Sequence, residues 1–347
     1  MQTNKKRASL SLAETGGRLM RSKPKLTFTT ALMASALAFT TATTALAEYP
    51  ERAIQAIVPW GAGGGADGIV RKIMSIAERD LPVSIFVENL DGGVTSIGIN
   101  RLMKSPADGY TIGALTYDSV VTVPWEGILP GYSLDKLDMI ALVTTEPNAM
   151  IVGGDTEYAS YEDLIAAAKQ AEGEINVGIM GLGSMTHLTL LQLQEMTGTR
   201  FRIISYPDGS AGQKEGVLSG EVEAAVTSLG DFAPLLTSGD ARGLVEFSTS
   251  ANPGFPEVPI SEQVGLDLQT GSFLLFATPA GTPDAAKQVL EDAIKTAWES
   301  DEFQDWARKV GVTATWMGSD TVTDFATDFQ TEIFKTLEEL TEQGILE

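Results

Sequence analysis

The sequence predicts an α/β fold built as two lobes. Short apolar runs alternate with helical patterns throughout residues 49–347, which is the order of elements in α/β proteins. Most of these runs are nearly continuous, as in strands buried on both faces, and this predicts mainly parallel sheets. About ten such runs in about 300 residues indicate two lobes rather than one.

The expected strands and helices follow from these patterns. The expected strands are 53–58, 83–87, 111–115, 139–143, 149–152, 175–179, 201–205, 222–228, 242–247 and 273–277. Ser160 and Asp163 have the spacing of a capping box, which predicts a helix to residue 171. Thr282 and Pro283 predict the start of a helix over 284–299, as N-cap and first helical residue. Val322, Phe325, Phe329, Ile333, Leu337 and Leu340 form one apolar stripe of a C-terminal helix.

Residues 1–47 have the pattern of an export signal. Seven basic residues and one acid precede the apolar run LTFTTALMASALAF, and the segment ends in Ala45-Leu46-Ala47. The alternative is a membrane anchor, but about 14 apolar residues are fewer than the ~20 that a spanning helix needs. A start at Met20 would give a more ordinary signal than a start at Met1. We therefore expect cleavage of residues 1–47 and export of the mature protein.

Composition excludes several classes of partner and site. The formal net charge of −22 makes nucleic acids and anionic membrane surfaces poor partners. The chain has no cysteine and one histidine, so we expect no disulfide, no metal and no lipid anchor on cysteine. If the protein binds anions, local dipoles must overcome an unfavourable overall field.

A glycine loop follows the first expected strand and precedes a helical run. Gly63-x-Gly65-x-x-Gly68 has the spacing of a dinucleotide-binding fingerprint, and Glu88 lies where a ribose-binding carboxylate is expected. An NAD-dependent oxidoreductase is therefore one hypothesis. However, glycine loops before helices suit any anion, because their free amides and the helix dipole point at one spot. A tight turn without a ligand is the third possibility.

The same stretch carries a family resemblance. YPERAIQAIVPWGAGGGADGIVRK is similar to the N-terminus of the solute receptors of tripartite tricarboxylate transporters, with matches at Tyr49, Pro50, Ile57, Val58, Pro59, Gly63, Gly64, Asp67 and Arg71. Trp60 replaces the usual Phe and Ala62 the usual Pro. The resemblance continues through VENLDGGVTSIG, ADGYT, GLGSMTHL, SYPDGSAGQKEGVLSGEVEAAV, PEVPISEQVG and ATPAGTP, and covers essentially all of residues 49–347.

This resemblance implies a periplasmic binding protein of type II-like fold, with two α/β lobes around a ligand cleft. It implies one lobe from residues 49–150 and 271–347 and the other from 151–270. The function implied is capture of a small carboxylate and its delivery to a membrane permease of a large and a small subunit, without catalysis or a cofactor. A sensor kinase is a further partner that we consider.

A second glycine loop holds the only histidine. GLGSMTHL follows the expected strand 175–179, and Ser184 or Thr186 can cap the helix after it. A hydrolase pair of Ser184 and His187 is the alternative, but the elbow G-x-S-x-G is absent and no second histidine can act as base. We expect His187 to hold the loop.

Polar residues after other strands complete the predicted site, because ligands in open α/β sheets bind beyond the carboxyl ends of strands. The aspartates among them would repel an anion unless they accept from an amine or hydroxyl of the ligand, so we expect them to set selectivity. Trp60 is either an apolar wall beside the ligand or a core residue. The predicted substrate-binding residues are Trp60, Gly61, Ala62, Gly63, Gly64, Gly65, Ala66, Asp67, Tyr117, Asp118, Ser119, Gly183, Ser184, Met185, Thr186, His187, Tyr206, Asp208, Ser228 and Asp231.

Overall fold

The computed structural model describes residues 49–342, and the expected signal segment lies outside the described residues. The strands are β1 Ile54–Val58, β2 Ile85–Asn89, β3 Thr111–Leu115, β4 Leu137–Gly153, β5 Asn176–Ile179, β6 Arg202–Ser205, β7 Ala224–Ser228, β8 Ala241–Glu246, β9 Gly271–Pro279 and β10 Thr313–Met317. The α-helices are α1 Gly65–Ala77, α2 Ser96–Met103, α3 Tyr117–Val120, α4 Thr122–Trp125, α5 Tyr161–Gln170, α6 Met185–Thr197, α7 Ser210–Ser219, α8 Ala233–Ser238, α9 Asp284–Glu299, α10 Asp301–Val310 and α11 Val322–Glu342. Short 3-10 helices are η1 Glu78–Asp80, η2 Leu134–Lys136 and η3 Ser261–Val264.

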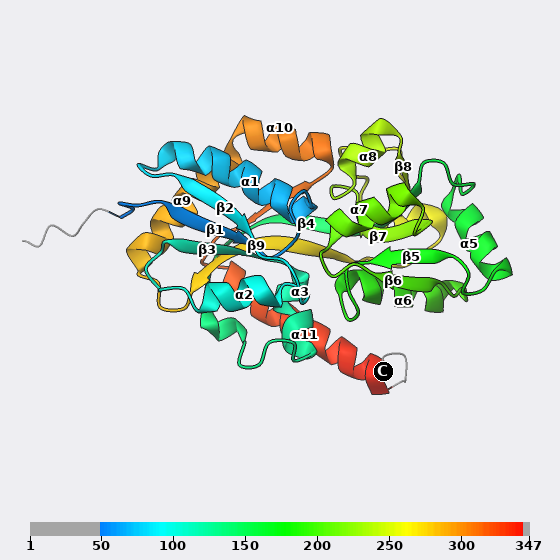
Figure 1. Cartoon of the computed structure of the whole chain (residues 1–347), viewed down its shortest axis with the longest axis horizontal. Helices are drawn as coiled ribbons and strands as arrows, with labels where there is room; N and C mark the ends of the chain where they lie inside the picture. Colours follow the sequence, from blue (N-terminus) through cyan, green and yellow to red (C-terminus); the bar gives the residue numbers. More distant parts are fainter. Residues whose placement is uncertain (1–48, 343–347) are drawn as a thin grey trace, which may run out of the picture. The chain divides into compact units, whose positions relative to one another are not determined.

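The strands pair in the order β2-β1-β3-β9-β4-β7-β5-β6, and β8 and β10 also pair with β4 (Figure 1). The 17-residue strand β4 changes partners along its length. Residues 137–147 pair with β9, and residues 148–153 pair with β7 and β8. We call β1, β2, β3, β9, β10 and the first part of β4 sheet region 1. The second part of β4 and β5 to β8 form sheet region 2.

The expectation of mainly parallel sheets was wrong at the centre of the sheet. Parallel pairing is confined to β1 with β2 and β3, and to β5 with β6 and β7, whereas β4 and β9 pair antiparallel with their neighbours. The strands expected at 139–143 and 149–152 are one strand. Pro147 lies where β4 passes from one set of partners to the next, so its missing N–H costs no ladder bond. Strand β10 was not predicted.

Helices cover both faces of each sheet region (Figure 1). In region 1, α1, α9 and α10 pack on one face around Ile69, Leu290 and Phe303, and α2 and α11 pack on the other around Leu102 and Val322. In region 2, apolar clusters also lie on both faces, with α5 and α6 on one side and α7 and α8 on the other. This double burial explains why most strands are continuous apolar runs.

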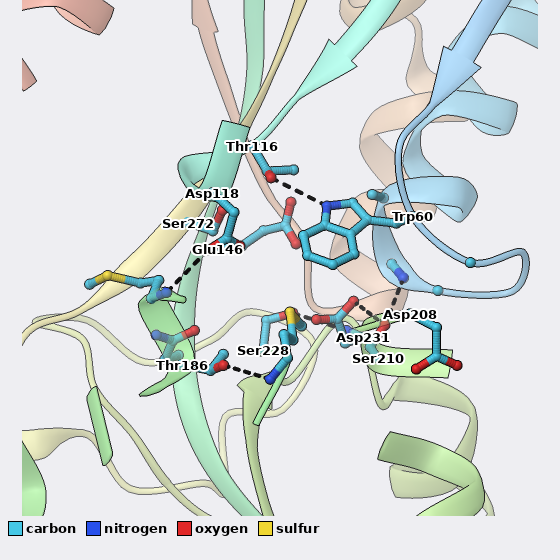
Figure 2. Close-up of a pocket in the computed structure, with 17 residues that line it drawn as sticks. Trp60, Thr116, Asp118, Glu146, Thr186, Asp208, Ser210, Ser228, Asp231 and Ser272 are labelled. Carbon is cyan, nitrogen blue, oxygen red and sulfur yellow. Dashed lines mark hydrogen bonds between the residues drawn. The ribbon is translucent and has the colours of Figure 1, made fainter. Parts of the chain in front are cut away.

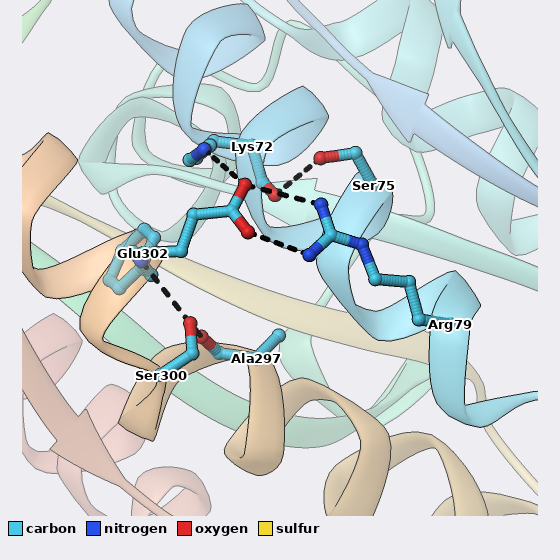
Figure 3. A network of polar contacts seen from close by, with 7 residues as sticks. Lys72, Ser75, Arg79, Ala297, Ser300 and Glu302 are labelled. Carbon is cyan, nitrogen blue, oxygen red and sulfur yellow. Dashed lines mark hydrogen bonds and ion pairs between the residues drawn. The ribbon is translucent and has the colours of Figure 1, made fainter.

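An ion cluster joins α1 and η1 to α10 on the outside of region 1 (Figure 3). The Glu302 carboxylate accepts from Arg79 Nη1 at 2.6 Å and from Lys72 Nζ at 2.8 Å. The hydrogen bonds from Arg79 and then Lys72 lower the pKa of Glu302 to about 2. Ser300 caps α10 beside this cluster by accepting from Phe303 N at 3.2 Å.

The local start signals are largely confirmed. Ser160 and Asp163 form the expected capping box of α5, and α9 spans the expected residues with Pro283 as its N-cap. Thr282 is not the cap, because its hydroxyl donates to the Pro279 carbonyl at 2.7 Å. None of the helices within residues 49–342 combines the length and apolar character needed to cross a bilayer.

Gly271, the first residue of β9, lies opposite Pro147, where β4 passes from region 1 to region 2. A Cβ at Gly271 would lie 2.6 Å from the Glu146 carbonyl oxygen, which is backbone and cannot move cheaply. We predict that Gly271→Ala lowers the free energy of unfolding by ~1–3 kcal/mol. Gly153→Ala is the control in β4, because its Cβ would meet nothing closer than 3.4 Å. Urea denaturation measures both; equal stability of the two variants would contradict the expectation.

Candidate functional site

The first glycine loop connects β1 to α1 and lies against region 2. Gly61 N–H donates to the Asp208 carbonyl at 3.1 Å, and Gly65 N–H donates to Ser210 Oγ at 3.3 Å. A Cβ at Gly61 would lie 2.9 Å from the Asp208 carbonyl oxygen. The glycines therefore allow two loops from different sheet regions to approach at backbone distance.

Asp67 holds this loop from within. Its carboxylate accepts from Gly63 N at 2.9 Å, from Arg71 Nε at 2.8 Å and from Asn89 Nδ2 at 2.9 Å. Burial works to raise the pKa of Asp67, but these hydrogen bonds outweigh it and hold the pKa below its usual value. Glu88, the expected ribose carboxylate, instead accepts from Gln55 on the neighbouring strand.

The second glycine loop connects β5 to α6. Ser184 caps α6 by accepting from His187 N at 3.2 Å, and His187 Nδ1 accepts from Gly183 N at 3.0 Å. Burial lowers the pKa of His187, which favours the neutral imidazole that can accept this bond. The histidine thus holds the loop, as expected. Thr186 Oγ1 accepts from Met180 N at 2.9 Å and closes the loop on its other side.

The two loops border one cavity of about 50 Å³ (Figure 2). One water molecule needs ~10–15 Å³ of such volume, so the cavity can hold on the order of four water-sized groups. Side chains from both sheet regions face it (Figure 2). The lining residues are Trp60, Gly61, Gly64, Gly65, Ala66, Thr116, Asp118, Glu146, Asn148, Met180, Met185, Thr186, Asp208, Ser210, Ser228, Asp231 and Ser272.

Four acidic residues line this cavity, namely Asp118, Glu146, Asp208 and Asp231, but the Asp208 carboxylate turns away toward Gly212 in α7 (Figure 2). The lining holds no lysine, arginine or histidine. Burial raises the pKa of Asp118 to about 6, against hydrogen bonds from Thr122 and Met185. Burial, and then the charge of Asp231, raise the pKa of Glu146 to about 8. Within residues 49–342, no group of three His, Cys, Asp or Glu side chains is placed to hold a metal ion.

Two of these carboxylates already lie at the helix N-termini that border the cavity. Asp118 Oδ1 accepts from Met185 N, the first residue of α6, at 3.3 Å. Asp231 Oδ1 accepts at 3.0 Å from Ser210 Oγ, which in turn accepts from the first residue of α1. A helix N-terminus contributes at most ~2 kcal/mol to an anion, whereas two like charges ~4 Å apart repel by ~4 kcal/mol near a protein surface. The repulsion from these carboxylates therefore opposes binding of a ligand that carries only negative charge.

The structure brings part of the predicted site together. The predicted residues that line the cavity are Trp60, Gly61, Gly64, Gly65, Ala66, Asp118, Met185, Thr186, Asp208, Ser228 and Asp231. Those that do not line it are Ala62, Gly63, Asp67, Tyr117, Ser119, Gly183, Ser184, His187 and Tyr206. Tyr117 belongs to the core of region 1, Ser119 bonds to Thr95, and the Tyr206 hydroxyl donates to Glu221 at 2.8 Å. Trp60 is buried in the core and also lines the cavity, so both roles that we expected for it apply.

Sequence reasoning missed six lining residues: Thr116, Glu146, Asn148, Met180, Ser210 and Ser272. Thr116 and Met180 directly follow expected strands, so the rule that found their neighbours could have found them. Glu146 and Asn148 lie inside β4, in a stretch that we had taken as a break between strands.

Comparison with known proteins gives one family. Residues 69–341 match the family model described as tripartite tricarboxylate transporter family receptor. The "UPF0065 protein in gbd 5'region" of Cupriavidus necator is 26% identical over 282 residues, which are 81% of this chain and 85% of the relative.

Solved structures show the same fold. The periplasmic binding protein BugD is 22% identical with a TM-score of 0.78, covering 86% of this chain and 99% of BugD. The R. palustris protein Rpa4515, solved with adipate, is 24% identical with a TM-score of 0.79, covering 84% of this chain and 98% of Rpa4515. The expected two-lobe α/β fold of periplasmic binding proteins is confirmed.

The raised pKa of Glu146 predicts a pH-dependent effect of Glu146→Gln. Since the folded-state pKa of about 8 exceeds the reference value of 4.5, the folded state binds more protons between these pH values and loses stability as pH rises. We expect the free energy of unfolding of the variant to exceed that of the parent protein by ~1–2 kcal/mol at pH 8, and to differ little from it near pH 4.5.

Chemical denaturation at both pH values measures this difference. Glu157→Gln, on an exposed loop, is the control and should match the parent protein at both. A Gln variant that is less stable than the parent at pH 8 would show that Glu146 is ionised and well compensated in the fold.

Proposed function

The chain belongs to the tripartite tricarboxylate transporter receptor family, and we propose from this premise that it captures a small carboxylate between its two lobes for a membrane permease. As a member of this family it is a periplasmic solute-binding protein. One neighbouring structure was solved with adipate, which supports an organic acid as the solute class. The two departures in the first loop, Trp60 and Ala62, argue against borrowing a relative's ligand.

The observation that carries the proposal is the pair of helix N-termini at one cavity. Ala66 in the first turn of α1 and Thr186 in the first turn of α6 both line it. Their backbone N–H groups have no acceptor within the described part of the chain. Free amides in first helical turns are donors suited to carboxylate oxygens, directly or through water.

The lobe boundaries that we propose are residues 49–150 with 271–347 for one lobe and 151–270 for the other. The change of partners in β4 at residues 147–148 and the start of β9 at Gly271 support these bounds. Closure would press the loop at Gly61 and Gly65 against the loop at Asp208 and Ser210. The chain crosses this boundary within β4 and again just before β9, and two such crossing segments are suited to hinge closure around a ligand.

We also propose that residues 1–47 are a cleaved signal peptide, that the permease has a large and a small subunit, and that the receptor itself has no catalytic activity. The positions of Ser184 and His187 support the absence of catalytic activity, because the serine hydroxyl caps α6 and does not approach an imidazole nitrogen. The NAD-dependent alternative loses its support at Glu88, which contacts Gln55.

Isothermal titration calorimetry of the mature chain against small mono- and dicarboxylates tests the proposal. We expect at least one member of the panel to bind with micromolar affinity or better. Binding of sugars or NADH, with no carboxylate bound, would contradict the proposed function.

A matched pair of glycine variants tests the role of loop closure. A Cβ at Gly65 would lie 1.9 Å from Asp231 Oδ1, across the cavity, whereas a Cβ at Gly68 in the same helix would meet nothing closer than 3.9 Å. We expect Gly65→Ala to weaken ligand binding at least about tenfold and Gly68→Ala to leave it unchanged. Equal affinity in both variants would show that the closed approach of the two loops is not needed for binding.

A further inference from the structure

The cavity holds more negative charge than capture of a plain carboxylate explains. The carboxyl groups of Asp118, Glu146 and Asp231 line it with no cationic side chain in the lining. Lys214 lies outside the lining, and its Nζ donates to the Gly63 carbonyl at 2.6 Å. Burial lowers the pKa of Lys214, although the charges of Asp231 and Asp67 act to raise it. A solute bearing only negative charge would enter a field of its own sign.

Unpaired acceptors also face the cavity. Asn148 is 3% exposed, and its Nδ2 donates to Thr189 Oγ1 at 2.8 Å, which leaves Oδ1 without a donor among residues 49–342. Asp118 is 4% exposed, and only its Oδ1 is bonded. Glu146 accepts through Oε1 from Thr144 at 2.9 Å, while Oε2 has no donor in the described chain. Asn148 Oδ1 and Asp118 Oδ2 belong to buried side chains that line the cavity, so a donor on the ligand can satisfy them, whereas Glu146 is half-buried and accepts at Oε2 only when it is ionised.

Trp60 lines the same cavity as these acids. In Figure 2, Glu146 is drawn to the left of its ring and Asp231 below it. Trp60 Nε1–H donates to Thr116 Oγ1 at 3.3 Å, so the indole donor is already used. An indole face beside carboxylates is the environment in which proteins bind ammonium and quaternary ammonium groups.

We propose that Asp118, Glu146 and Asp231, with Trp60, form a subsite for a positively charged nitrogen, so that the ligand is a small zwitterion with a carboxylate and an ammonium or quaternary ammonium group. This inference rests on the proposed function, because the carboxylate end is assigned to the free amides of Ala66 and Thr186. The acids that line the same cavity supply the charge complement for the nitrogen.

Matched ligands test the charge requirement by calorimetry on the mature chain. Glycine betaine and 3,3-dimethylbutanoate have the same shape and differ by one positive charge. In the second pair, 4-aminobutanoate carries a terminal ammonium group where pentanoate carries a methyl group. We expect the zwitterion of at least one pair to bind about tenfold or more tightly than its partner. Equal or tighter binding of the plain carboxylates would overturn the zwitterion and leave the proposed function standing.

Two further outcomes separate the inference from the proposed function. If choline, which lacks a carboxylate, binds as tightly as glycine betaine, both the zwitterion and the carboxylate receptor are overturned. Both are also overturned if neither the zwitterions nor the plain carboxylates bind.

Proton release gives a readout that a merely structural role of Glu146 would not produce. A cation beside Glu146 favours the ionised carboxylate, so binding at pH 7.5 should release protons, whereas an anion would cause uptake. The other titratable residues lining the cavity are Asp118, Asp208 and Asp231, with Lys214 and His187 nearby. Calorimetry in buffers of different ionisation enthalpy measures the number of protons; uptake on binding of the zwitterion would overturn the inference.

Glu146→Gln keeps the shape of the side chain and removes its charge. We expect it to lower affinity for the bound zwitterion about tenfold or more, to reduce proton release, and to leave or raise affinity for the matched plain carboxylate. Glu157→Gln, on an exposed loop, is the control and should behave as the parent protein. Loss of affinity for both members of a ligand pair would show that Glu146 acts on structure and would overturn its role in charge recognition.

Discussion

The hydrogen bond from Gly61 N–H to the Asp208 carbonyl is the contact on which the cavity depends. It brings the loop after β1 to backbone distance from the loop after β6, and only a residue without Cβ permits that approach. Ser210 then reaches both Gly65 and Asp231 and links α1 to the opposite region. The glycines thus serve close packing between two regions, whether or not their amides also meet a ligand.

Competition between amide dipoles and carboxylates determines what this cavity can hold. The N-termini of α1 and α6 provide donors, but Asp118 takes one of them and Asp231 is linked to another. The groups that stay unpaired are of both kinds, with amides at Ala66 and Thr186 and acceptors at Asn148 and Glu146. A site that offers both donors and acceptors can recognise two different groups of one molecule, which gives it orientation as well as affinity.

Local signals in the sequence predicted the parts of the site that local chemistry determines. Ser184 caps α6 because a serine before a helical run satisfies its free amides, and the glycine loop before α1 could be located from spacing alone. Asn89 and Asp67, by contrast, come together only because β1 and β2 are parallel neighbours. Tyr206 was predicted from its motif, but its hydroxyl turns to Glu221.

The residues inside β4 were beyond such reasoning. Glu146 and Asn148 lie beside a proline in a polar stretch between two apolar runs, and only their pairing with β9 and β7 reveals a single strand. The antiparallel centre of the sheet was mispredicted for the same reason. Pairing over long sequence separation depends on tertiary packing, which periodicity in one segment does not report.

Strand β4 completes the sheet of both regions, since its first residues pair with β9 and β10 and its last with β7 and β8. A fragment cut out at the lobe boundary would therefore leave the neighbours of β4 in the other region with an open sheet edge. Because residues of both regions line the cavity, a ligand bound there should stabilise both regions against heat at once.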